Sequence, residues 1–189
     1  VQMKKDFYTI PEMNRMTAEQ IRKYQESRLQ AQLTYCYTHS DFYRRKFEEA
    51  GARPEDIRTM EDLRKLPVFM VKDDERKSAE ASLEKYGHPF GLHLCCPVED
   101  IYLTGTTSGT TGMPTFSYTF TERDMEFLAP RIASRMALAG VGKGDRVAFF
   151  FALGIYATTM TLWGLRRLGA LPIDIDARAG TDLFLKFIG

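Results

Sequence analysis

The stretch Tyr102–Thr115, "YLTGTTSGTTGMPT", overlaps at its ends two short runs that predict strands, "EDIYLT" (residues 99–104) and "TFSYTF" (residues 115–120). Seven of its fourteen residues are Thr or Ser and three are Gly. Glycines let the main chain approach a ligand closely, and amides and hydroxyls donate to phosphate oxygens. Composition alone fits a phosphate-binding loop after a strand, but does not favour it over a second interpretation. A hydroxyl-rich turn without a ligand is the alternative.

Two common nucleotide-binding fingerprints do not fit the chain. The loop lacks the G-x-x-x-x-G-K-[ST] order of the P-loop. The glycine-rich "AGVGKGDRV" (residues 139–147) precedes a predicted strand, whereas a dinucleotide fingerprint follows one. This second stretch instead predicts the end of a helix and a turn.

Downstream of the loop, predicted helices and strands alternate. Thr121, with Asp124 three residues later, caps a helix that runs to about Gly140. The buried strand "DRVAFFFAL", a helix that ends at Gly169, the strand "ALPIDI" and a helix capped by Thr181 follow in that order. Such alternation predicts βαβ units and a layered α/β core with mainly parallel strands.

Upstream of the loop, the chain is charged and helix-like. Thr17 caps a first helix, and Ser40 or Asp41 caps a second one that stops near Gly51. Thr59, followed three residues later by an acid, caps a third short helix before Pro67. We therefore expect a helical region over residues 1–97, packed on a partial α/β core over residues 98–189 that carries the loop.

Composition argues against several classes of partner and location. The chain has 189 residues, and 26 Lys and Arg balance 25 Asp and Glu, which argues against nucleic acid or an acidic membrane as partner. The apolar run Val147–Leu153 is far shorter than the ~20 residues that span a bilayer, and "VQMKKDFYTI" at the N-terminus has no apolar signal segment. The odd set Cys36, Cys95 and Cys96 indicates a reduced, cytoplasmic chain.

The segment "HPFGLHLCC" places four potential metal ligands within nine residues: His88, His93, Cys95 and Cys96. The spacing of the two histidines suits zinc, but adjacent cysteines seldom both bind one ion. We interpret the thiols as buried or incidental and expect no metal site.

The order Thr107-Ser108-Gly109-Thr110-Thr111-Gly112-Met113-Pro114 resembles the phosphate loop of the AMP-forming acyl-CoA synthetase superfamily, [ST]-S-G-[ST]-T-G-x-P. Thr115, in place of the Lys that most of the superfamily carries, is typical of the phenylacetate–CoA ligase branch. The segments "SDFYRRKFEEAGARPEDIRTMEDLRKLP", "HPFGLHLCCPVEDIYL" and "AGVGKGDRV…LRRLGALPI" are also similar to that branch. The resemblance covers nearly all of residues 40–180.

This resemblance implies the N-terminal part of an adenylate-forming enzyme. ATP and an aryl or other apolar carboxylic acid would give an acyl-adenylate and pyrophosphate with Mg²⁺, and coenzyme A would then displace AMP. The implied ATP phosphate-binding residues are Thr107, Ser108, Gly109, Thr110, Thr111, Gly112, Met113, Pro114 and Thr115. The implied acid-pocket residues are Phe151, Gly154, Ile155 and Tyr156, for which ordinary core packing is the alternative.

Met113 departs from the pattern, because the family often has Lys there. The family's adenine-binding, Mg²⁺-associated and C-terminal lysine segments lie beyond Gly189, so no catalytic residue is assigned and we expect the chain alone to be inactive. Two alternatives stay open: a non-catalytic nucleotide- or acid-binding module that retains the fold, and a plain α/β domain with a hydroxyl-rich turn. The identity of the acid, the acceptor thiol and a homodimeric state also stay open.

Overall fold

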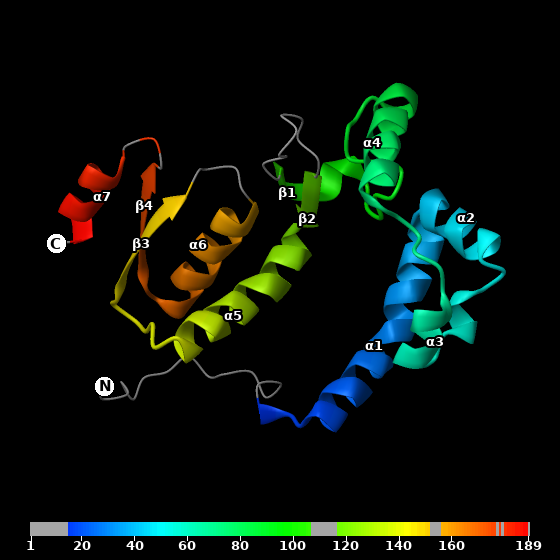
Figure 1. The fold of residues 1–189 in the computed structure, drawn as a ribbon, viewed down its shortest axis with the longest axis horizontal. Coiled ribbons are helices and arrows are strands. Elements are labelled where there is room, and N and C mark those ends of the chain that lie inside the picture. The colour runs from blue at the N-terminus through cyan, green and yellow to red at the C-terminus, as the bar shows by residue number, and fades with distance from the viewer. Residues whose placement is uncertain (1–14, 107–116, 152–155, 177, 179, 189) are drawn as a thin grey trace. The chain divides into compact units, whose positions relative to one another are not determined.

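The computed structural model describes residues 15–106, 117–151, 156–176, 178 and 180–188. These residues divide into two compact units, Arg15–Ile101 and the part that begins at Tyr102. The fold is mixed α/β and mostly helical, with two small sheets. Figure 1 labels the helices and strands.

The first unit is all helical. It contains α1 (Ala18–His39), α2 (Asp41–Glu49), α3 (Met60–Lys65) and α4 (Lys72–Tyr86), with the short 3₁₀ helices η2 (Pro54–Asp56) and η3 (Val98–Asp100). Thr17 caps α1 as expected: its hydroxyl accepts from the Gln20 amide at 3.3 Å, and the Gln20 side chain accepts from the Thr17 amide at 2.7 Å.

Aromatic packing holds α1 and α2 together. Phe47 of α2 is almost fully buried and meets Tyr37 and Phe69 edge to face, with ring centroids 5.8 and 5.0 Å away. The Gln30 amide of α1 donates to the carbonyls of Pro54 and Ile57 at 2.7 and 2.6 Å, which anchors the η2 turn. The core of this unit thus forms where α1 meets α2 and the turn that follows.

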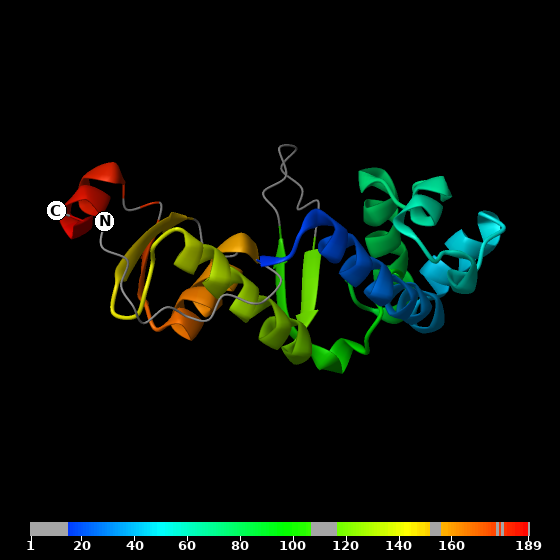
Figure 2. The same cartoon turned by 90° about the horizontal axis from the view of Figure 1, so that it is seen from below.

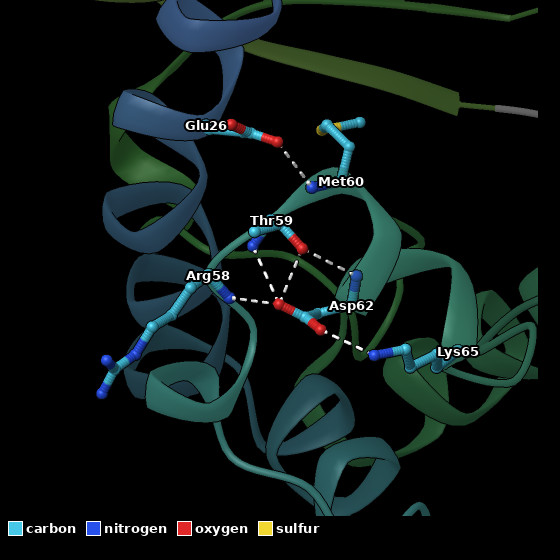
Figure 3. A network of polar contacts seen from close by, with 6 residues as sticks. All are labelled: Glu26, Arg58, Thr59, Met60, Asp62 and Lys65. Carbon is cyan, nitrogen blue, oxygen red and sulfur yellow. Dashed lines mark hydrogen bonds and ion pairs between the residues drawn. The ribbon is translucent and has the colours of Figure 1, made fainter.

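Helix α3 begins in the polar network of Figure 3. The Asp62 carboxylate accepts from the amides of Arg58 and Thr59 and from the Thr59 hydroxyl, at 3.3, 3.1 and 2.7 Å. Its other oxygen accepts from Lys65 at 2.9 Å. Glu26 of α1 accepts from the Met60 amide at 3.2 Å, so the same helix end is tied to α1. The expected Thr59 cap is confirmed.

The second unit contains β1 (Ile101–Thr106), β2 (Ser117–Thr121), α5 (Glu122–Leu138), β3 (Arg146–Phe151), α6 (Tyr156–Leu168), β4 (Leu171–Asp176) and α7 (Thr181–Ile188). Strands β3 and β4 pair in parallel, from Arg146 beside Leu171 to Phe151 beside Asp176. Helices α5 and α6 lie side by side (Figures 1 and 2), and Ala133, Ala137 and Leu168 form a buried cluster between them.

The single layered core that the sequence predicts is found only in part. The β3–α6–β4 unit is parallel as expected, but β1 and β2 pair with each other in a separate two-stranded sheet. Strands that are neighbours in sequence and joined by a short connection tend to pair locally. Strand β4 is also less buried than a layered core would make it, because Leu171 is 54% exposed. The expected boundary at residues 97 and 98 stays a prediction.

Candidate functional site

Residues 107–116, which hold the whole predicted phosphate loop, lie outside the described residues. The structure does describe the two strands that flank this segment, β1 and β2, which pair in one sheet and lie side by side in Figure 2. The prediction of a strand before and after the loop is confirmed. Both ends of the loop segment are thus anchored on paired strands.

The chain turns from β2 directly into α5. Thr121, the last residue of β2, accepts from the Asp124 amide at 3.3 Å, while the Asp124 carboxylate accepts from the Thr121 amide and hydroxyl at 2.9 and 2.8 Å. This capping box satisfies amides that the start of a helix otherwise leaves unpaired. It fixes the start of α5 at Glu122, directly after β2.

Helix α5 is in turn held firmly against α6. Gly164 of α6 approaches so closely that a Cβ placed on it would lie 2.3 Å from Ile132 Cγ2 and 3.1 Å from the Ala133 amide nitrogen. Glycine lets two helices approach more closely than any larger residue does. At Gly164, α5 and α6 are therefore in close contact.

An aromatic pair joins the loop's leading strand to the same helix. The rings of Tyr102 in β1 and Trp163 in α6 meet edge to face, with centroids 5.7 Å apart and planes at 86°. Such an arrangement is favourable for aromatic pairs. It brings β1, the strand that precedes Thr107 in the sequence, next to α6, the helix that begins at Tyr156.

The predicted acid-pocket residues are placed only by their backbone. Phe151 ends β3 and Tyr156 begins α6, while Gly154 and Ile155 lie outside the described residues, as do the side chains of Phe151 and Tyr156. These four residues therefore span the β3–α6 connection. Their role in a pocket stays a prediction.

The structure also shows a groove that the sequence gives no sign of. It has a volume of about 930 Å³ and runs along α5 and α6. Trp163, which is 40% exposed, forms part of its apolar wall, and Glu122, Glu126, Arg166 and Arg167 place charges of both signs around it. Groove residues come from two helices, so no local sequence pattern marks them.

The histidines of "HPFGLHLCC" each bind a serine of α4. His88 Nδ1 lies 2.8 Å from Ser82 Oγ, and His93 Nδ1 lies 3.0 Å from Ser78 Oγ. Burial lowers the pKa of His93. Among the residues that the structure describes, no three His, Cys, Asp or Glu side chains are grouped so that they could hold a metal ion. Within those same residues, no helix is both long and apolar enough to cross a bilayer.

A second cavity, of about 730 Å³, lies within the helical unit. Arg44, Arg45 and Lys85 line it together with Asp41 and Glu48. Arg44 already pairs with Asp41 at 3.0 Å. The mixture of charges selects no ligand of one sign.

Comparison with known proteins identifies relatives for most of the chain. It is 32% identical to the phenylacetate-coenzyme A ligase of Pseudomonas putida over 165 residues, which are 87% of this chain and 35% of that protein. It is 33% identical to the phenylacetate-coenzyme A ligase of Thermus thermophilus over 154 residues, 82% of this chain and 32% of that protein. The chain is homologous to phenylacetate–CoA ligases. No protein-family model matches it.

Solved structures agree with this homology. Crystal structures of 2-hydroxyisobutyryl-CoA ligase in complex with 2-HIB-AMP and CoA match it in two states. The thioesterification state has a TM-score of 0.74 and 34% identity, over 84% of this chain and 32% of that one. The open conformation has a TM-score of 0.79 and 29% identity, over 92% and 39%. The chain thus corresponds to about a third of the length of these adenylate-forming CoA ligases.

Proposed function

We propose that this chain is the N-terminal part of an ATP-dependent, AMP-forming aryl-acid CoA ligase. The observation that carries the proposal is the match at Thr107–Pro114, which falls on the connection between the paired strands β1 and β2 in a homologue of phenylacetate–CoA ligases. The relatedness of the chain to a ligase crystallised with an acyl-adenylate and CoA supports it further.

The proposed reaction has two steps. A carboxylate oxygen of the acid attacks the α-phosphorus of ATP, and pyrophosphate leaves with the electrons of the broken P–O bond. The thiol of coenzyme A then attacks the acyl carbon, and AMP leaves. Both steps bring anions together, so holding the phosphates in place is a large part of the catalytic problem.

The loop would hold the phosphates through hydroxyls and amides. Ser108, Thr110 and Thr111 offer hydroxyl donors, and Gly109 and Gly112 let backbone amides approach the β- and γ-phosphates. Met113 offers no charge, so this grip relies on neutral donors. Residues 107–115 contain no carboxylate, the group that Mg²⁺ commonly takes from proteins. The proposal therefore assigns phosphate contacts, and no metal ligand, to this stretch.

The acid would be aryl or otherwise apolar. Phe151, Ile155 and Tyr156 are large apolar or aromatic residues on the connection between β3 and α6, and such residues commonly line pockets for apolar ligands. A reduced, cytoplasmic setting fits the three cysteines, none of which forms a disulfide in the structure.

Product analysis tests the proposal. The protein that carries this chain together with the remaining ligase segments is incubated with ATP, Mg²⁺, phenylacetate and coenzyme A. We expect AMP and pyrophosphate in equal amounts, with one thioester formed per AMP. ADP and phosphate as products would contradict an adenylating enzyme. Absence of any product from folded protein that binds ATP would favour the non-catalytic module.

A further inference from the structure

Two of the three thiols are brought together by the fold. Cys36 lies in the last turn of α1, and Cys95 lies in the segment between α4 and η3, yet their side chains hydrogen bond to each other. The Tyr35 hydroxyl donates to the Cys95 carbonyl at 2.7 Å, across 60 residues of sequence. This second bond holds the Cys95 backbone beside the C-terminal end of α1.

The surroundings of the two sulfurs differ. Cys36 Sγ accepts from the Gln32 amide at 3.4 Å, while the Cys95 thiol points its hydrogen either to the His93 carbonyl, 3.4 Å away, or to Cys36. The hydrogen bond from Cys95 lowers the pKa of Cys36 to about 6, against the opposing effect of burial. The same bond, together with burial, raises the pKa of Cys95. The contact thus favours the thiolate form of Cys36, with Cys95 as the thiol that donates to it.

This arrangement is that of a reactive dithiol. Thiolates, not thiols, attack oxidants, and a second thiol in contact converts the first oxidation product into a disulfide before further oxidation. Both sulfurs are only half-buried, which leaves a path for a small oxidant. Disulfides also need closely spaced cysteines, a condition that two hydrogen-bonded thiols approach.

We propose that Cys36 and Cys95 form a reversible redox pair that hydrogen peroxide closes into an intrachain disulfide. The Cys36 thiolate attacks a peroxide oxygen, an S–O bond forms, the O–O bond breaks, and the leaving hydroxide takes a proton to become water. The Cys95 sulfur then attacks Cys36, the S–S bond forms and the S–O bond breaks. The Cys95 proton leaves with that oxygen as a second water. Peroxide gains two electrons, one from each sulfur. The proposal does not rest on the ligase function.

Cys96 supplies the matched control. It follows Cys95 directly, it is also half-buried and outside any disulfide, and it falls on the same tryptic peptide, residues 86–123. Cys36 falls on the peptide of residues 29–44. A crosslink between the two peptides therefore reports the bridge, and the variants Cys95→Ser and Cys96→Ser identify the sulfur that forms it.

The experiment treats the folded chain with hydrogen peroxide in slight excess and maps its peptides without reductant. We expect free thiols to fall from three to one, a crosslink between the peptides of residues 29–44 and 86–123, and full recovery with dithiothreitol. Cys96→Ser should keep the crosslink, while Cys36→Ser and Cys95→Ser should lose it. A crosslink that survives Cys95→Ser, or sulfinic acid at Cys36 without any crosslink, would overturn the proposal, as would three thiols that stay free.

A second arm repeats the oxidation in denaturant. In the unfolded chain Cys95 and Cys96 are nearly equivalent partners for Cys36, so both crosslinks should form in similar amounts. The native chain should favour the Cys36–Cys95 crosslink by tenfold or more. Equal crosslinking in the folded and unfolded chain would show that the fold does not select the pair, and would also overturn the proposal.

Discussion

The hydroxyl of Thr121 and the carboxylate of Asp124 hold each other across the first turn of α5, at 2.8 Å, and each also binds the backbone amide of the other residue. The same pair ends β2 and starts the helix, so the strand that follows the loop segment and α5 are fixed to each other through local contacts alone. Without this cap, the five-residue strand β2 would be followed by a helix whose first amides lack partners and whose first turn frays.

Loss of this cap should weaken the fold. Thr121→Ala removes the acceptor for the Asp124 amide and one donor to the carboxylate, and we expect a loss of about 1 kcal/mol in the free energy of unfolding. Urea denaturation followed by circular dichroism measures it. Thr121→Ser is the control, because it keeps the hydroxyl. Equal losses in the two variants would show that the cap hydrogen bonds are not the cause.

The contact between Gly164 and Ile132 predicts a difference between two glycine substitutions. Alanine at Gly164 would place a Cβ 2.6 Å from Ile132 Cβ. The Ile132 Cβ is bonded to the helix backbone, so it cannot move away freely. Overpacking costs about 1–3 kcal/mol, more than the ~1 kcal/mol that alanine adds in helix propensity. We expect a net loss of stability in thermal unfolding.

Gly142→Ala is the matched control for that substitution. Its added Cβ meets only Asp145 Oδ2, at an ordinary contact distance of 3.8 Å, so stability should change little. In the background of Ile132→Ala, the loss caused by Gly164→Ala should shrink, because the clashing side chain is gone. A Gly164→Ala variant as stable as the parent chain would mean that α5 and α6 are less tightly apposed than the structure shows.

Burial of His93 predicts a pH dependence of stability. Because burial lowers its pKa below the ordinary value of 6.5, the unfolded chain binds a proton before the folded chain does. This contribution is present above about pH 6.5 and is lost as the pH falls further. The free energy of unfolding of the parent chain should therefore decline more steeply below that pH than that of His93→Gln.

Two other groups, Cys36 and Glu75, also have shifted pKa values and contribute to the pH dependence of stability. The lowered pKa of Cys36 acts in the same direction, since its thiolate stabilises the folded chain and is lost as the pH falls through about 6. The raised pKa of Glu75, caused by burial, acts in the opposite direction. The comparison is therefore best made in a Cys36→Ser background. If the free energy of unfolding falls equally steeply with pH in the chains with and without His93, the predicted contribution of His93 would be contradicted.

Features that depend on residues close together in the sequence could be predicted more fully than contacts between residues far apart in it. The caps at Thr17, Thr59 and Thr121 are confirmed, because a capping residue and its partner lie three positions apart. Ser40 does precede α2, but its hydroxyl makes no cap bond and donates to the Leu92 carbonyl at 3.0 Å. Thr181 is the first residue of α7 and not the residue before it, a shift within the usual uncertainty of helix ends.

Helix α4 shows why a hydrophobic pattern can miss a helix. Its buried face carries Ser78 and Ser82, which bind histidines, so no apolar stripe marks it. The Cys36–Cys95 contact joins residues far apart in the sequence, and the pairing of cysteines cannot be read from their spacing. The groove along α5 and α6 depends on how the two helices pack. Such features appear only once the chain is folded.

The loop itself predicts a variant that separates binding from stability. Gly109→Val adds a branched side chain where a backbone amide is proposed to approach phosphate, so we expect a tenfold or larger loss of ATP affinity in the protein that carries the ligase segments. Its melting temperature without nucleotide should stay near that of the parent, because the substitution changes no residue of the paired strands β1 and β2. Isothermal titration calorimetry measures the affinity.

Met113→Lys is the complementary change at the same loop. A lysine there restores the cation that the family often has, and we expect tighter ATP binding that weakens again at high salt. A plain turn with no ligand would give no nucleotide-dependent signal in either variant. Unchanged ATP affinity in Gly109→Val would show that residues 107–115 do not hold the phosphates.

Acid-dependent exchange of pyrophosphate into ATP tests the central claim most directly, because it reports acyl-adenylate formation without coenzyme A. The protein with the ligase segments is assayed across aryl and small aliphatic acids, including phenylacetate and 2-hydroxyisobutyrate, with the 189-residue chain alone alongside. The account predicts exchange that requires an acid, is fastest with an aryl acid, is lost in Gly109→Val and is absent from the chain alone. Folded protein that binds ATP yet exchanges pyrophosphate with none of the acids would contradict it.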